Sequence, residues 1–140
     1  MSRQHYIYNT YEEAMKEVRR YGWRIESVRP DLITTHLAME AIKSCGGCLK
    51  YIPVHLITPE FAMEAVRWTG YNLKHVPTHL ITPELALIAV KQRGYDLEHI
   101  PAHLQTQEVI EIALKQDPGN SKYIKVKGLM MEALEEALSE

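Results

Sequence analysis

Two cysteines three positions apart are the residues whose type and spacing most resemble a reactive site. Cys45 and Cys48 enclose two glycines in the segment CGGC. Such a pair serves as a redox couple, or it supplies half of the four ligands of a zinc site. The pair follows a predicted helix, and the negative end of a helix disfavours the thiolate that either chemistry uses. The alternative is a plain structural role at variable positions.

Histidines are the other candidate metal ligands. They recur at a spacing of 24 residues in two sets, one with His55, His79 and His103 and one with His75 and His99. Stacked helices lie about 10 Å apart, whereas Zn²⁺ holds its donors at about 2 Å, so one set cannot form one site. A metal or redox hypothesis therefore rests on the two cysteines together with His75 and His79. The alternative is that each histidine binds a backbone group in a turn.

A basic residue recurs at the same spacing in five places, namely Arg19, Lys43, Arg67, Lys91 and Lys115. An acidic residue recurs in four, Glu12, Glu60, Glu84 and Glu108, with His36 in the remaining place. A row of five cations could follow a nucleic-acid backbone or an acidic protein surface. However, the acids fall in the first turn of each predicted helix and the bases in the last turn, where the helix dipole favours them. All three interpretations stay open.

Aromatic residues gather around the glycine that ends three of the predicted long helices, at Tyr21, Trp23, Trp68, Tyr71 and Tyr95. Trp23, Tyr71 and Tyr95 share one position of the 24-residue spacing. Tyrosine and tryptophan anchor many protein interfaces, but rings also pack against helix ends. The sequence allows both interpretations of these rings.

These shared spacings have one origin, a repeat of 24 residues that runs through the chain five times. One column consists of Thr10, Thr34, Thr58, Thr82 and Thr106, and another of Gly22, Gly46, Gly70 and Gly94, with Pro118 in the fifth place. Self-similarity at one period is the signature of stacked repeats. A single unit cannot cover its own apolar face, but neighbouring units can cover it.

Within each unit the sequence predicts a long helix and then a shorter element. In TPEFAMEAVRWTG, Thr58 is expected to cap the first turn, while Pro59 and Glu60 suit the first helical positions. Gly70 is expected to end the helix with a positive φ angle. The next segment, YNLKHVPTHLI, predicts a shorter helix or a pair of 3₁₀ turns, of which Pro77 opens the second.

We therefore expect an all-α solenoid that forms a single domain over residues 1–140. Its five helix–short helix (or 3₁₀) repeats are expected at about 7–30, 31–54, 55–78, 79–102 and 103–126. Residues 127–140 end in GLMMEALEEALSE and predict an amphipathic helix that caps the stack. The alternative is that this helix docks on a partner.

The segment AVKQRGYDLEHIPAHLQTQEVIEIALKQDPG, Ala89 to Gly119, resembles repeats of an uncharacterised bacterial and protist family, known only as a domain of unknown function. The 24-residue period is also similar to that of the leucine-rich repeat variant, an α/3₁₀ solenoid. The first resemblance implies a helical repeat with no assigned activity. The second implies the same fold, and members of that family can carry a cysteine-ligated iron–sulfur module, for which this chain has only one cysteine pair.

Composition narrows the function. The net charge of −2 and the 46% of hydrophobic residues are ordinary for a globular protein and do not favour a nucleic-acid coat. No apolar run reaches the ~20 residues that span a bilayer, no secretory signal begins the chain, and two cysteines form no secreted disulfide framework. We therefore expect a cytoplasmic, non-catalytic repeat module without a cofactor, which binds another protein as an adaptor or inhibitor. The alternatives are the metal or redox protein and, second, nucleic-acid binding along the basic column.

Overall fold

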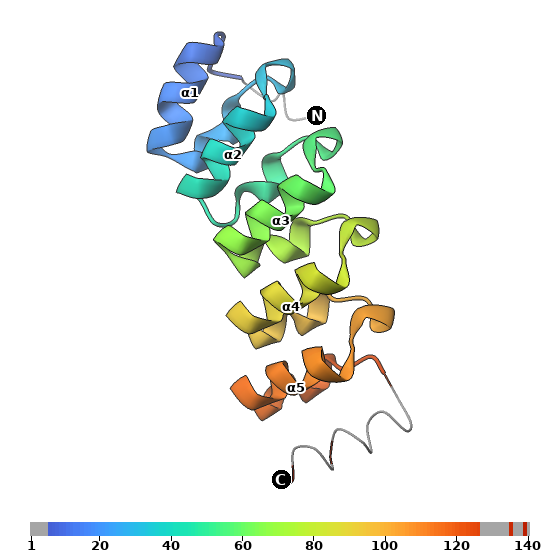
Figure 1. Cartoon of the computed structure of the whole chain (residues 1–140). Helices are drawn as coiled ribbons and strands as arrows, with labels where there is room; N and C mark the ends of the chain where they lie inside the picture. Colours follow the sequence, from blue (N-terminus) through green and yellow to red (C-terminus); the bar gives the residue numbers. More distant parts are fainter. Residues whose placement is uncertain (1–5, 127–134, 136–138, 140) are drawn as a thin grey trace, which may run out of the picture.

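Five α-helices stack in chain order along an elongated molecule (Figure 1). The computed structural model describes residues 6–126, 135 and 139. Within them the helices are α1 (Tyr11–Arg20), α2 (Thr35–Ser44), α3 (Pro59–Trp68), α4 (Pro83–Gln92) and α5 (Gln107–Gln116). Each has ten residues and begins 24 positions after the one before. The expected all-α solenoid is confirmed. The cap predicted over 127–140 lies outside the described residues, apart from Glu135 and Ser139.

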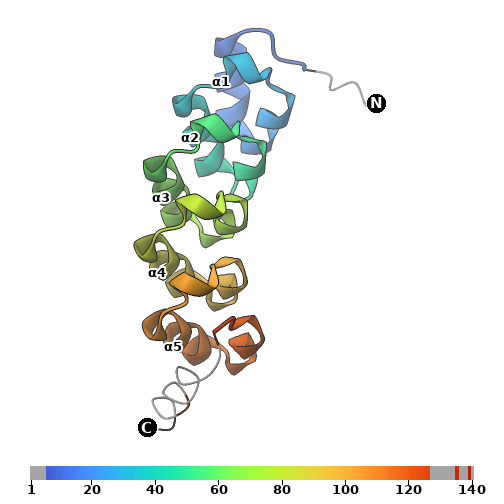
Figure 2. The ribbon, with the colours of Figure 1, turned by 90° about the vertical axis from the view of Figure 1, so that its right-hand side faces the viewer.

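Short 3₁₀ helices form the rest of each turn of the solenoid. The first in each turn is η1 (Gly22–Ser27), η3 (Cys48–Tyr51), η5 (Gly70–His75), η7 (Gly94–His99) or η9 (Pro118–Tyr123). These five pack on one another in that order and make a second layer beside the α-helices (Figure 2). The turns η2 (Pro30–Leu32), η4 (Val54–Leu56), η6 (Thr78–Leu80) and η8 (Ala102–Leu104) lead into the next α-helix. Of the two predicted forms, the pair of 3₁₀ turns is the one observed.

The threonine column caps the α-helices as predicted. The hydroxyl of Thr58, for example, accepts a hydrogen bond from the backbone N–H of Phe61 at 3.1 Å. The other members, Thr10, Thr34, Thr82 and Thr106, make the equivalent bond. Each bond satisfies an amide that the first helical turn leaves unpaired.

The core lies between the two layers and continues from one repeat to the next. A column of alanines in the α-helices, Ala41, Ala65, Ala89 and Ala113, is fully buried. Their small side chains allow adjacent helices to approach closely. Large apolar residues of the 3₁₀ layer face them, and Ile25, Leu49, Leu73 and Leu97 are almost completely buried. Each repeat therefore provides part of the apolar surface that covers its neighbour.

The glycine column has a different role from the predicted one. Helix α3 ends at Trp68, Thr69 follows in an extended conformation, and Gly70 begins η5 without a positive φ angle. The prediction for Gly70 was therefore wrong. Close packing explains the column instead, because a Cβ atom on Gly22 would lie 2.3 Å from the carbonyl oxygen of Ala41 in the next repeat.

A glutamine joins neighbouring repeats at the same place. The Oε1 atom of Gln116 accepts from the N–H of Gly94 at 2.7 Å, and its Nε2 donates to the carbonyl of Val90 at 2.7 Å. Gln92 makes the equivalent bonds one repeat earlier. These side chains satisfy carbonyls that the end of the preceding α-helix leaves unpaired. The glutamine bonds thus tie the fourth repeat to the third and the fifth repeat to the fourth.

Candidate binding surface

A row of exposed aromatic rings follows the 3₁₀ layer. Tyr21 and Trp23 lie at the start of η1, Tyr71 in η5 and Tyr95 in η7. Their exposed fractions are 43%, 54%, 44% and 48%, so each residue is about half exposed. We call these four residues the aromatic edge. Both interpretations that the sequence allowed, packing against helix ends and an interface, stay predictions for these rings.

Cationic side chains stack on the rings of the aromatic edge. The guanidinium carbon of Arg93 lies 4.6 Å from the ring centre of Tyr71 and 4.1 Å from that of Tyr95, so one cation bridges two repeats. The ammonium of Lys74 lies 4.5 Å from the ring of Tyr71. At the first repeat, Arg24 lies 4.7 Å from the ring of Tyr21 and 5.5 Å from that of Trp23. These distances are within the cation–π range of about 6 Å.

A buried carboxyl group holds the bridging cation. The Oδ2 atom of Asp96 lies 3.5 Å from Nε of Arg93, and the Asp96 side chain is almost fully buried. Burial raises the pKa of Asp96 to about 6, although Arg93 and Lys74 act in the opposite direction. The guanidinium therefore has rings and a carboxyl group around it, which restricts its rotamers.

The row of rings is interrupted at the second repeat, where Gly47 stands at the position of Trp23 and Tyr71. A hollow of about 260 Å³ opens there, and Trp23, Tyr51, Tyr71 and Gly47 are among its lining residues. Because η3 packs between η1 and η5, the missing side chain leaves a space between rings of the first and third repeats.

The hollow is electropositive. Lys50, Lys74 and His75 line it, and no acidic residue is among its described lining. Burial lowers the pKa of His75 below its ordinary value, and the nearby Lys74 and Lys50 lower it further. The two lysines therefore set the charge of this space at neutral pH.

The two cysteines form a disulfide that lines the same hollow. Cys45 follows the last residue of α2 and Cys48 begins η3. His75 also lines the hollow, but His79 does not. In the disulfide form the pair holds no thiolate that could ligate a metal. Across residues 6–126, 135 and 139, no three histidine, cysteine or acidic side chains are grouped as metal ligands.

The basic column lies in the last turn of the α-helices, at exposed positions. Arg19 is 3.6 Å from Glu40 of α2, and Arg67 is 3.8 Å from Glu84 of α4. Some of its members thus pair with acids of the next helix. A role of this column in binding a partner stays a prediction.

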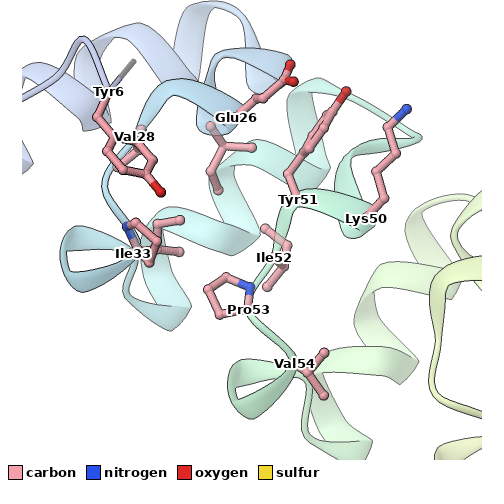
Figure 3. A pocket seen from close by; sticks show the side chains of 11 residues that line it. Tyr6, Glu26, Val28, Ile33, Lys50, Tyr51, Ile52, Pro53 and Val54 are labelled. Carbon is pink, nitrogen blue, oxygen red and sulfur yellow. The ribbon is translucent and has the colours of Figure 1, made fainter. Parts of the chain in front are cut away.

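A second hollow of about 380 Å³ lies between the first two repeats, near the start of the described chain. Figure 3 shows Tyr6, Val28, Ile33, Ile52 and Pro53 around it. Its lining is mostly apolar, and Lys50 also reaches it. No pair of candidate reactive residues meets there.

Sequence reasoning found the rings of the aromatic edge but missed the residues that organise them. Arg24 and Arg93 were not candidates, although each is next to, or two positions from, an aromatic residue. The hollow at Gly47 was also missed, and the available signal was a glycine in the column of Trp23 and Tyr71. The predicted Trp68 is exposed, and its indole N–H donates to the carbonyl of Lys43 at 3.0 Å, which links two repeats.

Comparisons with known proteins agree with part of the expected resemblance. The model of a domain of unknown function (DUF4116) matches residues 36–81, which run from α2 to the end of η6. The match does not reach Ala89–Gly119, on which the resemblance to such a family was based. No curated protein and no solved structure matches the chain. Separately, no helix in the described part of the chain is long and apolar enough to cross a bilayer.

Proposed function

We propose that the protein is a non-catalytic binding module, acting as an adaptor or an inhibitor, and that it binds another protein through the aromatic edge. The observation that carries this proposal is the placement of Arg93 between the exposed rings of Tyr71 and Tyr95. Tyrosine, tryptophan and arginine are the residues that dominate binding energy at protein interfaces. Here Tyr71 and Tyr95 are about half exposed, and Arg93 between them keeps 21% of its side-chain surface open to solvent.

The arrangement also reduces the entropy lost on binding. A free arginine loses rotamer freedom when a partner immobilises it, at about 0.5–1.5 kcal/mol per side chain. Arg93 is already held by two rings and by the carboxyl group of Asp96. A rigid stack of repeats likewise presents Tyr71 and Tyr95 in a fixed relation. The restricted side chain of Arg93 and the fixed relation of the two rings both favour protein recognition. Neither feature supplies a nucleophile or a general base.

The test is selection of phage-displayed random dodecapeptides on the purified protein and on a Tyr71→Ala/Tyr95→Ala variant. We expect the wild type to enrich a related set of peptides and the variant to retain them at least about tenfold less well, because two interface anchors are gone. A His55→Ala/His79→Ala protein is the control, since both histidines are exposed on η4 and η6. Equal retention by the ring variant, or no enrichment at all, contradicts the proposal.

The two alternative functions make separate predictions. A metal protein centred on Cys45 and Cys48 would contain stoichiometric zinc or iron by elemental analysis after purification under reducing conditions. Nucleic-acid binding along the basic column would give salt-sensitive retention on a polyanion column. A cytoplasmic location also stays a prediction.

A further inference from the structure

This inference rests on the proposed function and names the chemistry of the partner. We infer that the hollow at Gly47 receives an aromatic side chain from an acidic segment of the partner protein. The partner then supplies the ring that the second repeat lacks, between Trp23 and Tyr71. Carboxylates on either side of that ring pair with Lys50 and Lys74.

The backbone does not need glycine at position 47. Its φ and ψ angles are −109° and 11°, which lie in the bridge region that other residues also adopt in turns. A Cβ atom there would meet only the ring of Tyr71, at 3.4 Å. Gly22 is different, because a Cβ atom on it would overlap the backbone of the next repeat. The structural effect of Gly47 is therefore to leave a space.

The size and walls of this space fit one aromatic side chain. Its volume of about 260 Å³ is below the range of about 300–1,000 Å³ that is usual for drug-sized ligands and cofactors. Trp23, Tyr51 and Tyr71 supply aromatic surface around it. Rings pair favourably with other rings in offset or edge-to-face geometry. A partner ring between these walls would continue the row formed by the aromatic edge.

Charge selects the flanking residues of the partner. Lys50 and Lys74 occupy equivalent positions in η3 and η5 and both line the hollow. The residues at the same position in the repeats on either side are acidic, namely Glu26 and Glu98, and both are exposed. Acids therefore flank the two lysines within this column, while Arg24 and Arg93 add positive charge along the aromatic edge. A short acidic segment can pair with the two lysines at the hollow, and competition by an oligothymidylate distinguishes it from a nucleic-acid strand, which binds along a continuing cationic groove.

The deciding experiment compares Gly47→Tyr with Gly47→Ala in the same dodecapeptide selection. Gly47→Tyr fills the hollow from within and changes no charge, whereas Gly47→Ala leaves most of the space open. We expect the wild type and Gly47→Ala to enrich peptides in which an aromatic residue is flanked by aspartate or glutamate. We expect Gly47→Tyr to bind these peptides at least about tenfold more weakly. Circular dichroism verifies that each variant is folded.

Direct occupation can be followed with Trp23 as a reporter. The chain has two tryptophans, so a Trp68→Phe protein leaves Trp23 as the only source of fluorescence excited at long wavelength. An enriched peptide synthesised with phenylalanine at its aromatic position should change this signal on titration. The same peptide with alanine at that position should leave the fluorescence unchanged. The Lys50→Gln/Lys74→Gln variant should bind the phenylalanine peptide at least about tenfold more weakly, and its binding should depend less on salt concentration.

The outcomes separate this inference from the proposed function. If Tyr71→Ala/Tyr95→Ala abolishes capture but Gly47→Tyr binds like the wild type, the aromatic edge binds protein and the inference is wrong. Enriched peptides without acidic or aromatic residues also overturn it. An oligothymidylate that displaces the peptides and changes Trp23 fluorescence at lower concentration would assign the hollow to nucleic acid instead. If the wild type enriches no peptide at all, the inference and the proposed function are both wrong.

Discussion

The Oδ2 atom of Asp96 lies 3.5 Å from Nε of Arg93, and neither buried atom has a hydrogen-bond partner. Asp96 stands at the repeat position of Asn72 and Asn120. Each of these asparagines donates a hydrogen bond at 2.9 Å to a carbonyl at the end of its own α-helix. An ionised carboxylate cannot make that donation. The fourth repeat thus exchanges a structural hydrogen bond for an ion pair that holds Arg93 against two rings.

We predict that Asp96→Asn stabilises the protein at pH 7. Burial raises the pKa of Asp96 from 3.8 to about 6, so the folded state binds more protons than the unfolded state between these values. The contribution of this group to stability therefore falls as pH rises through that window and stays lost above it. The full shift corresponds to about 3 kcal/mol. This figure is an upper limit, because the surroundings relax around a buried charge, and we expect a gain of roughly 1–2 kcal/mol.

Urea unfolding of the wild type and of Asp96→Asn at pH 4 and at pH 7 measures how the substitution changes the free energy of unfolding. Burial lowers the pKa values of His75 and His99, so their contribution is lost as pH falls, with the opposite sign. Both proteins contain these histidines, and the difference between the proteins isolates residue 96. A stability difference that is the same at both pH values would show that titration of Asp96 is not responsible.

The glutamine that ties repeats together gives a second prediction. Gln116→Ala removes the bonds to Gly94 and Val90 and leaves their backbone groups without partners. We expect a loss of about 1–3 kcal/mol in the free energy of unfolding. Gln107→Ala is the matched control, because its side chain bonds only to Glu111 at an exposed position, and it should change stability by less than about 0.5 kcal/mol. Similar losses in both would contradict the link between repeats.

Two glycines that look alike in sequence should respond in opposite ways to alanine. Gly22→Ala places a methyl group against the Ala41 carbonyl at 2.3 Å and the Cys45 side chain at 2.7 Å, so we expect a loss of about 1–3 kcal/mol. Gly47→Ala meets no backbone atom within contact distance and restricts the unfolded chain. It should be neutral or stabilising by about 0.4–1 kcal/mol. Thermal unfolding of the two variants makes the comparison, and an equal loss in both would refute it.

The disulfide should be replaceable by the residues that other repeats use. Cys45 and Cys48 stand at the repeat positions of Thr69 and Asn72. The side chain of Asn72 donates a hydrogen bond to the carbonyl of Ala65 in α3, so it links η5 to that helix without a disulfide. The cross-link closes a very short loop, so its chain-entropy contribution is about 2 kcal/mol at most. We expect Cys45→Thr/Cys48→Asn to fold and to lose no more than about 2 kcal/mol in the free energy of unfolding, relative to the oxidised wild type. An unfolded double variant would assign the disulfide an indispensable role.

The repeats, the threonine caps and the all-α class could be predicted because their causes are local and recur in sequence. Thr58 caps an amide three residues away, and the same pattern appears five times. The bonds of Gln116 could not be read in this way, since they reach Gly94 and Val90 more than twenty positions earlier. The placement of Arg93 between Tyr71 and Tyr95 likewise depends on how far apart two repeats lie. Period alone does not specify that distance.

The central claim is that the aromatic edge, rather than the basic column of the α-helices, binds the partner. Isothermal titration of one enriched peptide tests it directly, against Tyr71→Ala/Tyr95→Ala and against Lys43→Ala/Lys91→Ala/Lys115→Ala. The account predicts that the ring variant binds at least about tenfold more weakly, while the lysine variant stays within about threefold of the wild type. Loss of binding in the lysine variant with unchanged binding in the ring variant would contradict it.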